Sequence, residues 1–184
     1  MLRTHPAEIL IGERVELKRL ALPFAEVIFK AIDLDRERLS QFLPWVDHMK
    51  TVQDEANYLQ GQVEDWNQAN QFNFAIFLKE SDEYVGNIGA HSISFQHERC
   101  EVGYWLRGKF ESQGYMTESV KLPEKELFKI GFHRIEIHCS SSNLRSAAVP
   151  LRCGYSQEAL LRENAIENGR FRNTLVFGKL KSES

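Results

Sequence analysis

The chain has 184 residues, of which 42% are hydrophobic and 11% aromatic, enough apolar material for the core of one domain over residues 1–184. Its formal net charge is -3 and it has no basic block, which excludes a general nucleic-acid or membrane-surface binder. No apolar run approaches the roughly 20 residues of a membrane span, and the N-terminus lacks the core of a signal peptide. We therefore expect a globular cytoplasmic protein.

The cysteines exclude two further classes of protein. There are three of them, Cys100, Cys139 and Cys153, and no pair has CxxC spacing. An odd number without that spacing indicates neither a disulfide framework nor a zinc site. We expect buried, reduced thiols and no metal site.

The N-terminal region predicts a strand followed by helices. Val15 and Leu17 alternate with charged residues, the pattern of a strand with one buried face. One or two helices are predicted over residues 22–42. The turn at residues 43–45 follows, and we expect it to bury the indole ring of Trp45.

A further helix is predicted to begin after Thr51, a good cap residue, with Asp54 and Glu55 in its first turn. We expect it to end near Asn70. Its predicted apolar face consists of Tyr58, Leu59, Val63 and Trp66.

Three strands are predicted next, over residues 72–78, 84–93 and 99–106. The first two are separated by a short charged turn, as in a hairpin. The third strand is expected to pair beside them.

The segment that follows predicts a helix, a strand and a second helix. The first helix covers residues 115–130 and contains Pro123, which lacks an N–H group and should bend the helix near Val120 without abolishing it. A strand over residues 134–139 follows a helix and can therefore lie parallel to an earlier strand. The second helix, over residues 143–152, is short.

The chain should end with two strands, over residues 155–162 and 171–179, and Gly154 before them is a natural helix-ending residue. The total is seven strands interleaved with helices. This order predicts an α/β protein with a mixed sheet and helices on its faces.

The most informative stretch lies between Glu101 and Glu118. A strand over residues 101–106 ends shortly before Gly114, where a helix is predicted to begin. The unpaired N–H groups and the positive dipole end of such a helix favour a bound diphosphate. The sequence therefore predicts a site for a phosphorylated ligand, the alternative being that Gly114 only permits a tight turn.

Three motifs occur in order: Glu-Val-Gly-Tyr-Trp at residues 101–105, Gly-Tyr-Met-Thr-Glu at 114–118, and Asn-Leu-Arg-Ser at 143–146 with Gly-Tyr at 154–155. Together they resemble the GNAT superfamily of acetyl-CoA-dependent N-acetyltransferases. More narrowly, they resemble the branch that acetylates the N-terminal serine or alanine of ribosomal proteins. The resemblance implies a mostly antiparallel sheet whose central parallel strand pair splays apart.

The resemblance also implies the residues that hold acetyl-CoA. The pantetheine arm would lie in the splayed gap and pair with backbone groups of Tyr104, Trp105 and Leu106. The diphosphate would lie on the next turn, made of Lys109, Phe110, Ser112, Gln113, Gly114, Tyr115 and Met116. This turn departs from the superfamily pattern twice, because Lys109 replaces an arginine or glutamine and Ser112 replaces the first glycine. A lysine offers phosphate a point charge where arginine offers a fork.

Acetyl transfer to an amine needs a base for the amine, donors for the oxyanion and an acid for the departing thiolate. The resemblance implies Glu101 as the base; the alternative is a structural carboxylate paired with Arg99 or Arg134. A backbone amide near Tyr104 or Trp105 would be the oxyanion donor. His138 is a reserve base. The loop carboxylates Glu163 and Glu167 are candidates to line the acceptor entrance.

The acid is less obvious. Many superfamily members have a tyrosine where this chain has Pro150, which cannot donate a proton. Ser146 is the best substitute, because the ribosomal-protein branch carries serine there, although a serine in a first helical turn also satisfies an orphan amide. Asn143 is implied as a pantetheine ligand, or as the helix cap, or as both. Cys139 and Cys153 have no neighbour in sequence that would activate a thiol, which disfavours a ping-pong mechanism.

Three functions remain open at this stage. The first is acetylation of a protein N-terminal α-amine, with a ribosomal protein as acceptor. The second is acetylation of a small amine such as a polyamine or an aminoglycoside, and the third is an acyl-CoA-binding module without turnover. Analogy with the family predicts a homodimer.

Overall fold

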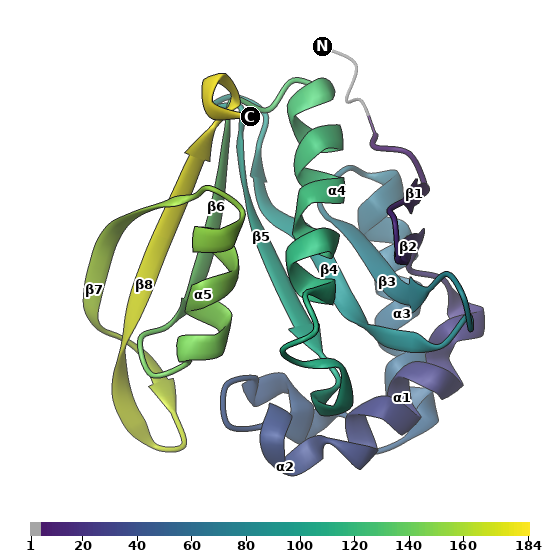
Figure 1. Cartoon of the computed structure of the whole chain (residues 1–184). Helices are drawn as coiled ribbons and strands as arrows, with labels where there is room; N and C mark the ends of the chain where they lie inside the picture. Colours follow the sequence, from purple (N-terminus) through teal and green to yellow (C-terminus); the bar gives the residue numbers. More distant parts are fainter. Residues whose placement is uncertain (1–4) are drawn as a thin grey trace.

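The computed structural model describes residues 5–184 as an open sheet with helices on both faces (Figure 1). Within this part of the chain the sheet has eight strands, in the order β1-β2-β3-β4-β5-β6-β8-β7. The strands are β1 (Ile9–Ile11), β2 (Val15–Arg19), β3 (Phe72–Leu78), β4 (Tyr84–Ser94), β5 (Arg99–Leu106), β6 (Arg134–Ser140), β7 (Ser156–Glu167) and β8 (Arg170–Leu180).

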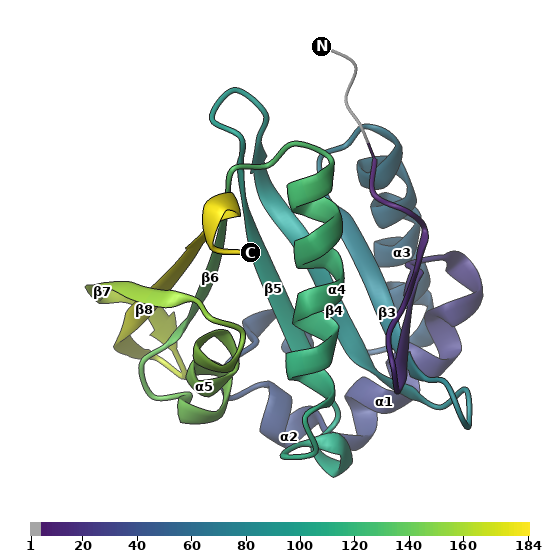
Figure 2. The ribbon, with the colours of Figure 1, turned by 45° about the horizontal axis from the view of Figure 1, so that its top comes forward.

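The helices lie in two layers. Figure 2 shows α4 across one face of the sheet, with α1 and α3 behind it. The α-helices are α1 (Ala25–Leu34), α2 (Arg36–Leu39), α3 (Val52–Asn67), α4 (Tyr115–Lys129) and α5 (Leu144–Arg152), and short 3₁₀ turns cover Leu22–Phe24, Pro44–His48, Gly108–Phe110 and Lys181–Glu183. The larger core cluster packs α4 and α5 on the sheet, and a smaller one packs α1 and α3 on the opposite face.

One strand pair differs from all the others. Every neighbouring pair in the sheet is antiparallel except β5 and β6, which are parallel. The β5–β6 ladder contains only three residue pairs and ends where Glu101 faces Glu136. Beyond that point β5 continues to Leu106 alongside β4, and β6 continues to Ser140 alongside β8. The expected mixed sheet and its splayed central pair are therefore confirmed.

The prediction of seven strands was wrong by one. The additional strand, β1, is only three residues long and pairs with β2 as a hairpin. Ile9 and Ile11 are exposed and only Leu10 is buried, so too few residues alternate to reveal a strand in the sequence.

Helix α3 begins as predicted, and two of the four residues of its predicted apolar face, Leu59 and Trp66, are buried. Thr51 caps it, with the capping-box partner Asp54. The helix ends at Asn67, and the predicted apolar face is corrected because Tyr58 is exposed and Val63 is half-buried. The residues that face the sheet are Glu55, Leu59, Gln62 and Trp66. The helix thus turns a carboxylate toward the protein interior.

Three more expectations are refined by the fold. Helix α4 is continuous from Tyr115 to Lys129 with Pro123 inside it. Trp45, expected to be buried, is half-buried, and its ring packs 6.2 Å from that of Trp105. Strand β7 continues to Glu167, so Glu163 and Glu167, both expected in a loop, lie within a strand, and Glu163 is near a bulge in its pairing with β8.

Candidate functional site

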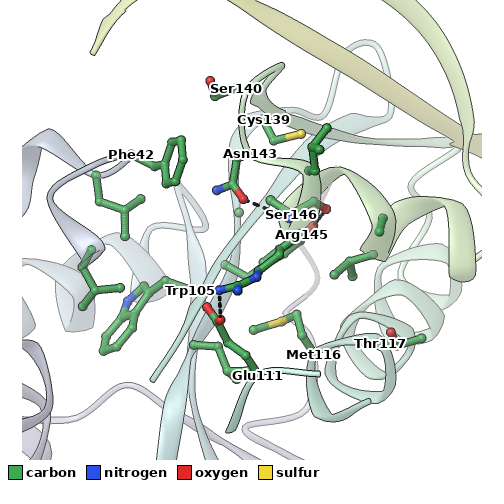
Figure 3. Close-up of a pocket in the computed structure, with 18 of the residues that line it drawn as sticks. Phe42, Trp105, Glu111, Met116, Thr117, Cys139, Ser140, Asn143, Arg145 and Ser146 are labelled. Atoms are coloured by element: carbon green, nitrogen blue, oxygen red, sulfur yellow. Dashed lines mark hydrogen bonds and ion pairs between the residues drawn. The ribbon is translucent and has the colours of Figure 1, made fainter. Parts of the chain in front are cut away.

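The gap between β5 and β6 opens into a cavity of about 830 Å³ (Figure 3). Its walls come from the ends of the two splayed strands, the first turn of α4, helix α5 and the segment around Phe42. Because the β5–β6 ladder stops at Glu101, the backbone edge of β5 that faces the gap is not paired with β6. An extended ligand can hydrogen-bond to such an edge.

The turn before α4 and the first residues of that helix line this cavity. Gly114 caps the helix in the left-handed conformation, with φ 84°, and Tyr115 is the first helical residue. Ser112 is also left-handed, with φ 61°. Consecutive N–H groups in such a turn, at the positive end of a helix dipole, form an anion-binding concavity.

Arg14 and Glu118 brace this turn, which no sequence motif indicated. The Arg14 guanidinium donates to the Glu118 carboxylate at 3.0 Å and to the Gln113 carbonyl at 2.9 Å, and it lies 4.8 Å from the Tyr115 ring centroid. Burial raises the pKa of Glu118, but hydrogen bonds from the backbone amides of Arg14 and Val15 outweigh burial and hold it below its usual value. The β1–β2 hairpin therefore fixes the start of α4.

The left-handed conformation of Ser112 should lower the free energy of unfolding relative to a glycine at this position. A non-glycine residue pays about 1 kcal/mol or more in this region, and glycine does not. We expect Ser112→Gly to raise the free energy of unfolding by about 1 kcal/mol, measured as a higher denaturation midpoint with an unchanged slope. Ser81→Gly, in an exposed turn without a positive φ, is the control and should not stabilise the protein. Equal gains in the two variants would contradict this explanation.

Of the twelve residues expected to hold the cofactor, ten line the cavity: Tyr104, Trp105, Leu106, Phe110, Ser112, Gly114, Tyr115, Met116, Asn143 and Ser146. Lys109 and Gln113 do not. The Lys109 ammonium is directed at Glu83 and lies over the Phe110 ring, and the Gln113 side chain donates to the Lys109 carbonyl at 2.7 Å. Lys109 therefore points away from the cavity. The family pattern implies that a residue at this position contacts the phosphate.

Basic residues that the sequence reasoning missed also line the cavity. Arg145 and Arg152 project from α5, and Figure 3 shows Arg145 directed at Glu111. The Arg145 guanidinium lies 2.5 Å from the Glu111 carboxylate, and Arg152 donates to the Thr117 hydroxyl at 3.0 Å. Spacing alone could have indicated them, since Arg145 is the third residue of the Asn-Leu-Arg-Ser motif and Arg152 follows the motif on the same helix.

Asn143 and Ser146 stand together at the start of α5 (Figure 3). The Asn143 side-chain oxygen accepts from the Ser146 amide at 3.1 Å, so the capping role of Asn143 is confirmed. The Tyr104 hydroxyl donates to the Ser146 carbonyl at 3.0 Å, and burial raises the Tyr104 pKa, which keeps this phenol protonated. Pro150 is buried within α5 and is not among the residues that line the cavity.

Glu101 lies at the apex of the gap between two histidines. The nearest carboxylate oxygens are 3.9 Å from His91 Nε2, on the neighbouring strand β4, and 3.5 Å from His138 Nδ1, on β6. The alternative pairing with Arg99 or Arg134 was wrong, because both arginines contact Glu136 instead.

The second nitrogen of His138 is anchored. Its Nε2 lies 2.9 Å from the Glu136 carboxylate. Burial raises the pKa of Glu136, but hydrogen bonds from Arg134 and His138 outweigh burial and hold it below its usual value. An ionised carboxylate only accepts hydrogen bonds, so Nε2–H is the donor. Nδ1 then faces the Glu101 carboxylate.

The remaining candidates are placed as follows. Glu167 lines the cavity and accepts from the Ser140 hydroxyl at 2.9 Å, whereas Glu163 is exposed and does not line it. Cys139 lines the cavity, and burial raises its thiol pKa to about 11. Over residues 5–184 no helix is long and apolar enough to cross a bilayer, and no cluster of three or more His, Cys, Asp or Glu side chains could hold a metal ion.

Comparisons with known proteins identify this arrangement. Over 173 residues the chain is 24% identical to the ribosomal-protein-serine acetyltransferase of Escherichia coli, covering 94% of this chain and 96% of that protein. The solved structure of RimL, a ribosomal L7/L12 α-N-protein acetyltransferase in complex with coenzyme A, has a TM-score of 0.90 at 20% identity, covering 94% and 98% of the two chains.

The microcin C7 self-immunity acetyltransferase MccE, solved with acetyl-CoA and AMP, has a TM-score of 0.87 at 22% identity, covering 92% and 93% of the two chains. At these identities the two structures establish the shared fold. The model of the acetyltransferase (GNAT) domain family matches residues 14–156, most of the chain. The protein therefore belongs to the GNAT acetyltransferase family and is an acetyltransferase.

Proposed function

We propose that this protein transfers an acetyl group from acetyl-CoA to the N-terminal α-amine of a protein, with a ribosomal protein as the acceptor class. The observation that carries the proposal is the cavity at the β5–β6 gap, which has a carboxylate at its apex and a helix N-terminus at its rim. Similarity to the E. coli enzyme and to RimL supports the acceptor class. A ribosomal acceptor implies that the protein acts in the cytoplasm.

The residues present fit acetyl-CoA. The edge of β5 from Val102 to Leu106 offers backbone groups to a pantetheine amide, and the turn from Ser112 to Met116 offers N–H groups to a diphosphate. Arg145 and Arg152 add positive charge to the same cavity. When bound, acetyl-CoA supplies the activated acetyl group as a thioester. We assign these residues to binding and orienting it.

Glu101 is the proposed base. An N-terminal α-amine has a pKa of about 8, so near neutral pH a large part of it must lose a proton before it can attack. The Glu101 carboxylate is placed at the apex of the gap, and His138 can take the proton onward because its Nδ1 faces Glu101. His138 is held in position by Glu136.

Ser146 is the proposed acid for the departing thiolate. It lines the cavity from the first turn of α5, and its amide is already satisfied by Asn143, so its hydroxyl is not needed to cap the helix. Pro150 cannot donate a proton and lies away from the cavity wall. Tyr104 positions Ser146 through the bond to its carbonyl.

The state of Cys139 supports direct transfer without an acetyl-enzyme. This thiol lines the cavity, but burial raises its pKa to about 11 and keeps it protonated near neutral pH, whereas the thiolate is the nucleophile. We expect the intact mass of the protein to show no covalent acetyl adduct after incubation with acetyl-CoA alone. Initial rates should fit a ternary-complex pattern; parallel double-reciprocal lines together with an adduct would contradict this mechanism.

The function is tested by measuring thiol release from acetyl-CoA with a panel of acceptors. Peptides with free N-terminal serine or alanine, the same peptides with blocked N-termini, spermidine and an aminoglycoside form the panel. Release with free but not blocked peptides supports the proposal. Release with only the small amines would favour the second function, and tight acetyl-CoA binding without release would favour a module without turnover.

A further inference from the structure

A second cavity, of about 410 Å³, lies beneath α1 and α3 and meets the first. The two share five lining residues: Leu43, His91, Gly103, Tyr104 and Trp105. Its floor is the face of β4 and β5 on which Gly89 is directly opposite Gly103. Because neither glycine carries a side chain, the Asn73 side chain can lie over Gly89 and the His91 ring over Gly103, which puts two polar side chains on this floor.

Glu55 lines this second cavity from the first turn of α3. The residue is 1% exposed, and its Oε1 has no hydrogen-bond partner. A buried polar atom without a partner costs free energy, and natural proteins retain few of them. A ligand that donates a hydrogen bond to Oε1 would remove this cost.

The rest of the wall suits a cation. Of the described residues that line the second cavity, Glu55 is the one carboxylate, and there is no lysine or arginine. Trp45 and Trp105, whose ring centroids are 6.2 Å apart, border it, and aromatic faces attract ammonium and guanidinium groups. Asn73 and Asn87 add side-chain amides.

We propose that the second cavity binds a cationic side chain of the acceptor, a lysine or arginine close to the amine that is acetylated, with Glu55 accepting its N–H. This inference rests on the proposed function, since it places the acceptor amine at Glu101 and the following residues along the β4–β5 face. The burial of Glu55 raises its pKa to about 7, and an adjacent cation would favour the ionised form.

The test compares matched peptides that begin with serine and carry lysine or its uncharged analogue norleucine at the second, third or fourth position. For the wild-type protein we expect at least one lysine peptide to have a kcat/KM about tenfold or more above its norleucine partner, mainly through a lower KM. In Glu55→Gln this ratio should fall to within about twofold of one, with the norleucine peptides little affected. Glu64→Gln, an exposed position on the same helix, is the control and should keep the ratio.

The possible results distinguish the proposed cation site at Glu55 from the proposed acetylation of a protein N-terminus. Equal acetylation of lysine and norleucine peptides by the wild type, or a ratio that Glu55→Gln leaves unchanged, would overturn the role of Glu55 while leaving the protein acceptor intact. If no peptide is acetylated but spermidine is, and butylamine is not, in a Glu55-dependent manner, the cation site stands and the protein acceptor fails.

Discussion

Glu101→Gln should lower kcat for acetyl transfer to a peptide amine by about 100-fold at pH 7, within the usual range for losing a general base. Glutamine keeps the shape of the side chain at the apex of the gap but cannot take a proton. Glu101 lies far from the turn at Gly114, at the other end of the splayed strand, so the KM for acetyl-CoA should change little. Steady-state kinetics by thiol release measures both constants.

The pH dependence provides a second readout. The acceptor amine is already neutral well above its pKa of about 8, so the deficit of Glu101→Gln should narrow as pH rises from 7 to 9.5. Glu98→Gln, an exposed residue just before β5, is the control and should retain wild-type kinetics. A constant deficit across this pH range would indicate a positioning role, and an unchanged kcat would remove Glu101 as the base.

Glu55→Gln should stabilise the protein at alkaline pH. Burial raises the pKa of Glu55 from 4.5 to about 7, so the folded state retains a proton that the unfolded chain releases. The free energy of unfolding therefore falls as pH rises from about 4.5 to about 7 and stays low above that range. Removing this group should make the variant more stable than the wild type by about 2 to 3 kcal/mol at pH 8 and by much less at pH 5.

Denaturant unfolding at both pH values measures the effect. Tyr58 is partly exposed, but the surrounding protein desolvates its phenol and raises its pKa to about 12. Burial holds the pKa of Tyr84 well above its usual value, so neither neighbouring phenol titrates in this range. His91 lines the same cavity and is present in both proteins. Glu64→Gln should show no pH-dependent gain, and an equal difference at pH 5 and pH 8 would contradict the buried, protonated state of Glu55.

The two effects of Glu55→Gln together distinguish function from packing. A residue that only filled space would give the stability gain without the change in peptide preference. A buried carboxylate that lowers the free energy of unfolding but is needed to bind the acceptor fits the trade-off between stability and activity that is often found at functional sites. Because the variant is expected to be more stable, a loss of lysine preference could not be attributed to misfolding.

Local sequence patterns were sufficient to predict most of the secondary structure. The seven expected strands, the Thr51 cap and the helix after Gly114 all follow from alternation, capping chemistry and glycine placement within a few residues. Strand β1 was missed because three residues contain too little alternation, and the length of β7 was missed because its residues are mostly exposed. The buried face of α3 was predicted only in part: Leu59 and Trp66 are buried as expected, but a carboxylate, Glu55, occupies a buried position where an apolar residue is expected.

In the candidate site, too, some residues could be predicted from sequence motifs and others could not. The stretch from Glu101 to Met116 and the residues Asn143 and Ser146 could be selected from sequence because their motifs are contiguous. The environment of Glu101 could not be predicted from the sequence, because His91 and His138 approach it from two other strands. The same holds for the bracing of the phosphate turn by Arg14, which is 104 residues away from its partner Glu118.

The sequence by itself determined the family resemblance, the order of the elements and the strand-turn-helix expected to bind acetyl-CoA, because these depend on backbone preferences over short spans. Only the tertiary structure decided which side chains share a cavity. It placed two histidines beside Glu101, turned Lys109 outward to Glu83 and buried Glu55 without a partner for Oε1. The physical reason is that hydrogen bonds and ion pairs act over a few ångströms, and folding alone brings distant residues that close.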